Sequence, residues 1–241
     1  MSIEQHQITI SGMPVYIVRK DIKNLHLGVY PPDGRVRVAV PRQVTNDAVR
    51  LAVIGKLRWI RRQQAKFETQ ARQSEREMVT GETHYLLGRR YRLRVTSHSG
   101  ATEIVARGST IELRVRPHLD ARQRERALQR WYRHQLKELA VPLVEKWQQS
   151  LGVQLTECRV KRMKTKWGTC NAKARRIWLN LELVKKPVEC TEYVIVHELV
   201  HLIERHHNDR FISILNEHLP RWRSFRDALN AAPLAHENWS Y

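Results

Sequence analysis

The chain has 241 residues, 41% of them hydrophobic, which is enough to bury a core in one large or two small domains. No apolar run approaches the roughly 18 residues of a membrane span, and Cys158, Cys170 and Cys190 form no CxxC pair, which argues against a disulfide framework or a four-cysteine zinc site. The formal charge of +19 predicts attraction to polyanions. The amino-terminal residues lack the basic and apolar regions of a signal peptide, so we expect a cytoplasmic protein.

Residues 6–40 alternate apolar and polar side chains at period two, which predicts an antiparallel β-meander with a tight turn over residues 31–34. A helix capped within Thr45–Asp47 is expected to run to about residue 75. One face of this helix is basic and is the best candidate for a surface that contacts nucleic acid; it carries Arg50, Lys56, Arg58, Arg61, Arg62 and Lys66. Trp59 in the same helix is expected in the core rather than stacked on a base.

Strands resume between Tyr85 and Val115, and Asp120 is expected to cap a long amphipathic helix that ends near residue 150. Pro142 is expected to kink or split that helix. A strand, a turn at Gly168 and a second strand over residues 177–183 follow, and the sequence shows no internal repeat. The expected fold class is α+β.

The sequence His197-Glu198-Leu199-Val200-His201 reads HExxH within an apolar helical frame. Residues four apart lie on one face of a helix, so His197 and His201 can bind one metal ion, and Glu198 can reach a zinc-bound water as general base. Imidazoles and a carboxylate are costly in an apolar helix unless a partner satisfies them, and a metal does so. The alternative is a pair of core histidines bonded to backbone.

A catalytic zinc site needs a third protein ligand, and the nearby candidates are His206, His207, Glu192, Glu204 and Glu217. His207 is favoured because it lies six residues past His201, as in HExxHxxGxxH metalloproteases. Glu204 stands where those proteases have glycine, which argues against a metzincin. A helix ending near Arg205 and a new helix capped by Asn208 or Asp209 would still return His207 to the metal.

Several stretches resemble a known family. They are Met163–Cys170, Leu179-Asn180, Val194–Leu202 with His207, Phe211 and Leu219–Trp222, and, nearer the amino terminus, Asp33–Pro41, Lys56–Ile60 and Gly81–Tyr91. Together they resemble the YgjP-like (SprT-like) zinc metallopeptidases over nearly the whole chain. The resemblance implies a Zn²⁺ cofactor, with His197, His201 and His207 as ligands and Glu198 as catalytic base. It also implies a zincin-like domain over residues 119–241, after a β-rich domain with the basic helix over residues 1–118. Thr169 replaces a frequent serine of the family, and Ile203 a frequent lysine.

The leading expectation is a peptidase acting on a protein or peptide substrate. The strand Trp178–Leu183 is expected to hold an extended substrate at a sheet edge, and Lys166, Thr169 and Asn180 are candidates for substrate or oxyanion contacts. Three alternatives remain: a metal-dependent nucleotide (UTP) pyrophosphatase, a DNA-associated SprT-like protease acting on DNA-bound proteins, and a nucleic-acid-binding module with a structural metal. The chain has no Gly-rich phosphate loop, which disfavours the first alternative.

Overall fold

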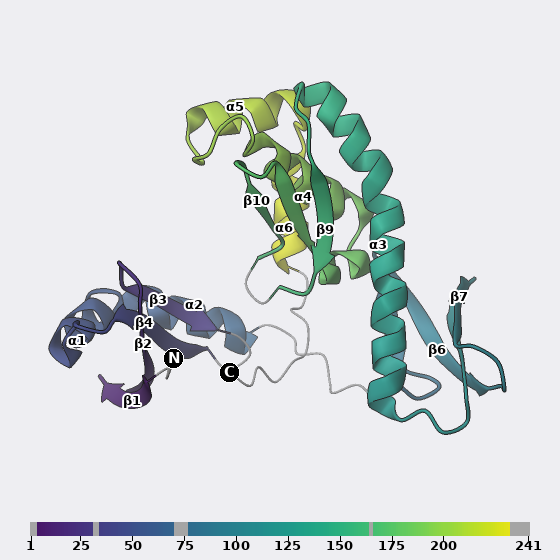
Figure 1. The fold of residues 1–241 in the computed structure, drawn as a ribbon, viewed down its shortest axis with the longest axis horizontal. Helices are drawn as coiled ribbons and strands as arrows, with labels where there is room; N and C mark the ends of the chain where they lie inside the picture. The colour runs from purple at the N-terminus through teal and green to yellow at the C-terminus, as the bar shows by residue number, and fades with distance from the viewer. Residues whose placement is uncertain (1–3, 31–33, 70–76, 164–165, 232–241) are drawn as a thin grey trace. The chain divides into compact units, whose positions relative to one another are not determined.

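The computed structural model describes residues 4–30, 34–69, 77–163 and 166–231, so part of the expected turn over residues 31–34 lies outside the described residues. The described residues divide into two compact units, residues 4–69 and residues 77–231, with the boundary between Glu75 and Arg76 (Figure 1). Each unit is taken by itself below. Within the described ranges, none of the helices is long and apolar enough to cross a membrane.

The first unit holds a four-stranded sheet of mixed direction. Its strands are β1 (Glu4–Ile10), β2 (Met13–Lys20), β3 (His26–Tyr30) and β4 (Arg35–Pro41), in the order β1-β2-β4-β3. The β1–β2 and β3–β4 pairs are antiparallel, but β2 and β4 run parallel, so the predicted antiparallel meander is wrong. Period-two alternation shows which face of a strand is buried and carries no information on the direction of its neighbour.

Two helices follow where one was predicted: α1 (Asn46–Gly55) and α2 (Leu57–Thr69). The hydroxyl of Thr45 caps α1 by accepting the N–H of Ala48 at 3.2 Å, as expected. Lys56 leaves helical geometry and its N–H donates to Val53 O at 3.0 Å, which ends α1. Val49, Val53 and Ile60 are buried against the sheet.

The second unit begins with a sheet of the same strand order and directions. Its strands are β5 (Thr83–Leu86), β6 (Arg89–Ser97), β7 (Glu103–Arg107) and β8 (Thr110–Val115), ordered β5-β6-β8-β7 with β6 parallel to β8. The first hairpin of each sheet turns through two residues of positive φ, Ser11-Gly12 and Leu87-Gly88. The sequence showed no repeat because the two sheets share topology and turn geometry rather than side chains.

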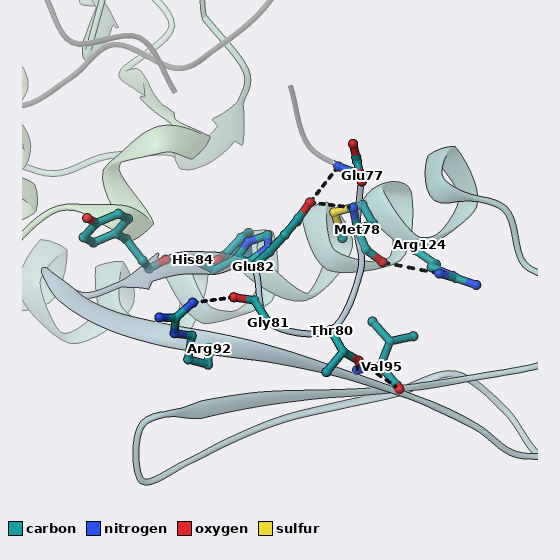
Figure 2. A network of polar contacts seen from close by, with 11 residues as sticks. Glu77, Met78, Thr80, Gly81, Glu82, His84, Arg92, Val95 and Arg124 are labelled. Atoms are coloured by element: carbon teal, nitrogen blue, oxygen red, sulfur yellow. Dashed lines mark hydrogen bonds and ion pairs between the residues drawn. The ribbon is translucent and has the colours of Figure 1, made fainter. Parts of the chain in front are cut away.

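A polar network fastens the start of the second unit to its sheet (Figure 2). The carboxylate of Glu82 accepts the N–H groups of Glu77 and Met78 at 2.7 and 3.0 Å. Arg92 donates to Gly81 O at 2.6 Å, and Arg124 of the following helix donates to Met78 O at 3.3 Å. The second unit therefore begins, among the described residues, at Glu77.

The expected domain boundary at 118/119 runs through this unit. Leu93 and Ile111 of the β5–β8 sheet share one hydrophobic cluster with Leu128 and Tyr132 of α3 (Ala121–Leu151) and with Ile195 of the site helix. Figure 1 shows α3 extending from the β5–β8 sheet to the elements around α4. A division at 118/119 would open that cluster, whereas the division at 75/76 leaves it whole.

The boundaries of α3 confirm the prediction. The carboxylate of Asp120 accepts the N–H of Gln123 at 2.7 Å, and the side-chain oxygen of Gln123 accepts the N–H of Asp120 at 3.0 Å, which forms a capping box. Gly152 ends the helix at φ 63°. Pro142 lies inside the helix, which stays one element rather than splitting.

The last part of the unit carries the site. The strands β9 (Glu157–Lys161), β10 (Gly168–Asn171) and β11 (Arg176–Asn180) are ordered β10-β11-β9, so β11 is central and β10 is an edge. A short 3₁₀ helix, η1 (Leu181–Lys185), replaces the predicted end of the second strand, and α4 (Val188–Val200), α5 (Asp209–His218) and α6 (Trp222–Ala231) follow. Gly168 opens β10 and pairs with Leu179, so it lies in a strand and the predicted turn at Gly168 is wrong. The α+β class is confirmed.

Candidate metal centre and its cleft

Three histidine side chains from two segments meet at one point. Nε2 of His207 lies 3.0 Å from Nε2 of His197 and 3.1 Å from Nε2 of His201. Phe211 packs against all three rings, with centroid separations of 4.7 to 5.0 Å. Three imidazole nitrogens in such contact cannot all carry protons toward one another, and three converging lone pairs suit a bound divalent metal.

The turn after α4 brings His207 back without a glycine. The helix ends at Val200, five residues earlier than predicted, and Glu204 N donates to Val200 O at 2.8 Å. The carboxylate of Glu204 accepts the N–H of His206 at 3.0 Å. Asn208 then caps α5 by accepting the N–H of Phe211 at 3.0 Å, as one of the two predicted caps. A side chain therefore makes the bend that glycine makes in HExxHxxGxxH proteins.

The same turn orients a ring of the cluster. Nδ1 of His201 lies 3.2 Å from the carbonyl oxygen of Glu204, so a proton on Nδ1 leaves Nε2 free to bind a metal.

The other candidates for a third ligand lie apart from the cluster that His197, His201 and His207 form. His206 is exposed like His207, but neither it nor Glu217 is among the side chains whose ligand atoms lie within 4.8 Å of one another. Glu192 accepts from Lys146 at 2.8 Å and from Trp147 at 2.9 Å. Within the described residues, His207 is thus the candidate that joins the HExxH histidines.

Burial sets the protonation of the two HExxH histidines. It lowers the pKa of His197 to about 3, with His201 and His207 adding repulsion, and it also lowers the pKa of His201. Both imidazoles are therefore neutral at pH 7, which is the form that binds metal. Burial raises the pKa of Glu198 to about 7, against the attraction of Lys166, and a carboxyl that titrates near neutrality suits proton transfer.

Gly168 makes room for Glu198, a role that the predicted turn did not suggest. A Cβ at position 168 would lie 2.6 Å from Oε1 of Glu198, 2.7 Å from its Cγ and 2.8 Å from Cγ1 of Val194. Its φ is not in the positive range, so the requirement is close approach rather than backbone freedom. Any other residue would push Glu198 away from β10.

The three candidates for oxyanion or substrate contacts lie in different settings. The Oδ1 atom of Asn180 accepts from Met163 N and Glu182 N at 3.3 and 3.2 Å, and its Nδ2 donates to Met163 O and Lys166 O, both at 2.8 Å. Its amide is thus committed to holding the segment before β10. Lys166 and Thr169 do line the cleft.

The cleft beside the histidines has a volume of about 1020 Å³, and the edge strand β10 forms one of its walls. The predicted substrate strand Trp178–Leu183 is wrong, because β11 has neighbours on both sides. Tyr193 also lines the cleft and stacks on Trp222 with ring centroids 6.1 Å apart. Its place four residues before His197, on the same helix face, is the signal that would have found it.

A family model described as YgjP-like, metallopeptidase domain, matches residues 23–232. The chain belongs to the YgjP-like family. The match spans the histidine cluster, Glu198 and Gly168, and it makes the protein a member of a family of metal-dependent peptidases.

Two solved structures show weaker likeness, and no curated protein matches. The metallopeptidase zymogen of Pyrococcus abyssi abylysin is 24% identical with a TM-score of 0.35, covering 36% of this chain and 89% of its own. The metallopeptidase zymogen of Methanocaldococcus jannaschii jannalysin is 22% identical with a TM-score of 0.34, and the match covers 39% of this chain and 86% of that one.

The predicted basic face lies in the first unit. Arg50, Lys56, Arg58, Arg61 and Arg62 are all exposed on α1, α2 and the junction between them, while the side chain of Lys66 lies outside the described residues. Trp59 is 39% exposed, so the prediction that it belongs to the core is wrong. Leu51 and Ile54 are also exposed, at 72% and 51%.

Proposed function

We propose that the protein is a zinc metallopeptidase in which His197, His201 and His207 hold Zn²⁺ and Glu198 is the general base. The observation that carries this proposal is the convergence of three Nε2 atoms beside a buried carboxylate. Three imidazoles suit zinc better than the oxygen-binding cations Mg²⁺ and Ca²⁺. When bound, zinc would supply Lewis acidity, which lowers the pKa of water toward about 7 and polarises a carbonyl.

Groups that line the cleft are proposed to transfer the proton, position the substrate and contact the oxyanion. Glu198 takes a proton from the attacking water and returns it to the leaving amine. The edge of β10 offers backbone N–H and C=O groups to an extended peptide, which positions the bond to be cleaved. Lys166 and Thr169 are proposed to contact the substrate or the developing oxyanion.

The Glu198→Gln variant tests the mechanism, because it keeps the size of the side chain and removes the base. We expect it to bind zinc in the same ratio as the wild-type chain and to lose at least about 100-fold in casein hydrolysis. His207→Ala is expected to lose zinc affinity as well. Hydrolysis at the wild-type rate by zinc-loaded Glu198→Gln would refute the role of this carboxylate.

Nucleotide hydrolysis is the second candidate, and the cationic side chains of the cleft favour it because phosphates are anions. Zinc-loaded protein is incubated with casein and with UTP in parallel. Peptide cleavage is the expected result. UTP turnover without proteolysis would overturn the peptidase proposal and support the metal-dependent pyrophosphatase.

We also propose that the basic face of α1 and α2 contacts nucleic acid. Exposed cations beside the exposed ring of Trp59 are the combination that binds single strands by charge and stacking. Single-stranded DNA is expected to stimulate cleavage of a DNA-bound protein. The double variant Arg58→Glu/Arg61→Glu should lose the stimulation and keep basal activity, whereas Lys137→Glu on α3 should keep both. Stimulation that persists in the double variant would remove this face from the proposal.

We also propose that the protein is located in the cytoplasm. Each of the three cysteines is free, as expected in a reducing compartment. Cell fractionation tests it, and recovery of the protein outside the cytoplasmic fraction would contradict it.

A further inference from the structure

The cleft around the histidine cluster is strongly cationic. Among the described residues, its lining includes Lys161, Lys166, Lys173, Arg205 and Arg226, and one carboxylate, that of Glu198. Arg226 is held by Asp227 at 2.9 Å and lies against the ring of Trp222. The other four cations are exposed.

These four cations lack the partners that neighbouring cations have. Close to the cleft, Arg176 pairs with Glu157 and Lys185 with Glu182, both at 2.7 Å. In the part of the chain that the structure describes, Lys161, Lys166, Lys173 and Arg205 form no such ion pair. Lys166 also attracts the carboxylate of Glu198, but the summed charge of the four exceeds that one carboxylate and acts on whatever occupies the cleft.

The placement of these cations follows the edge strand. Lys166 lies two residues before β10 and Lys173 two residues after it, so a cation stands beyond each end of the strand. Lys161 ends β9, with its ammonium 4.5 Å from the centre of the Trp178 ring, and Arg205 lies in the turn between His201 and His207. A peptide paired with β10 would meet positive charge on both sides of the bond to be cleaved.

We propose that the cleft selects peptides with Asp or Glu on both sides of the scissile bond, bound through Lys161, Lys166, Lys173 and Arg205. This inference rests on the proposed peptidase function and names its substrate class. Exposed ion pairs are individually weak, so each carboxylate is expected to improve binding about two- to fivefold and two carboxylates about tenfold. The preference is expected to shrink as salt is added.

The test uses three peptides of one sequence whose flanking residues are Glu, Gln or Lys. Cleavage by zinc-loaded wild-type protein gives kcat/KM, and fluorescence anisotropy on zinc-loaded Glu198→Gln gives Kd without cleavage. We expect the Glu peptide to bind and be cleaved about tenfold better than the Gln peptide, mainly through Kd and KM. Lys161→Glu/Lys173→Glu should abolish the preference, while Lys137→Glu on the exposed face of α3 should keep it.

The outcomes separate this inference from the peptidase proposal. Equal binding of the Glu and Gln peptides, or a preference unchanged in Lys161→Glu/Lys173→Glu, would overturn the inference and leave the peptidase standing. Preferential binding of the Glu peptide without cleavage of any peptide would remove the peptidase and overturn the inference as a statement about substrates, because no bond would be cleaved. Binding of UTP or inorganic phosphate, with neither binding nor cleavage of any of the three peptides, would overturn both.

Discussion

Replacing Gly168 by alanine is expected to disable the site without touching a histidine. The new Cβ would stand 2.6 Å from Oε1 of Glu198, where ordinary contact begins at 3.4 Å, so the carboxylate must move by about 0.8 Å. Misplacement of about 1 Å in an active site can reduce the rate on the order of 100-fold. We therefore expect kcat to fall by about 10- to 100-fold. Because Val194 is also in the way, overpacking is expected to cost about 1–3 kcal/mol of stability.

The assay combines peptide-cleavage kinetics, zinc content and urea unfolding. Gly168→Ala should keep its zinc, because the three atoms nearest to the new Cβ belong to Glu198 and Val194 and not to a histidine. Gly55→Ala is the matched control, since a Cβ there has nothing within 4 Å and Gly55 ends a helix. It should keep full activity and gain up to about 1 kcal/mol of stability. Wild-type kcat in zinc-loaded Gly168→Ala would refute the argument that Glu198 needs this glycine.

Three further substitutions test the framework of the second unit by urea unfolding. Asn180→Ala removes three hydrogen bonds to the segment before β10 and one to the N–H of Glu182, and it is expected to cost about 2–4 kcal/mol. A cost below about 0.5 kcal/mol would contradict that role. Burial lowers the pKa of Lys186 from 10.5 to about 8, so its ammonium destabilises the fold below pH 8. The stability of the wild type relative to Lys186→Met should therefore rise by about 3 kcal/mol between pH 8 and pH 10.5, and a flat difference would contradict it. Pro142 is exposed inside α3 and lacks an N–H, so Pro142→Ala should add about 1–3 kcal/mol, and a loss of stability would contradict it.

The sequence by itself determined the features whose signals are local. The HExxH spacing brings His197 and His201 to one helix face, because a helix repeats every 3.6 residues. Asp120 and Gly152 bound α3 through bonds made within a turn or so of each end. Asn208 likewise caps α5, and the α+β class follows from the mixture of the two periods.

Local patterns gave wrong predictions for strand pairing and burial, because these depend on segments that are distant in the sequence. Alternation along residues 6–40 showed buried faces, but the parallel pairing of β2 and β4 depends on where the β3–β4 hairpin docks. The edge position of β10, rather than β11, depends in the same way on the order of three strands. Trp59 was expected in the core from its helical spacing, yet no part of the sheet covers it fully.

The tertiary structure alone decided how the site is completed. His207 joins the cluster because the carboxylate of Glu204 holds the turn, and that bond forms only once α4 has ended at Val200. Gly168 is separated from Glu198 by 30 positions, so its need for close approach is invisible until β10 packs on α4. The sequence determined which residues bear the chemistry. The fold determined their distances and the charge of the cleft, because contacts between distant segments exist only after packing.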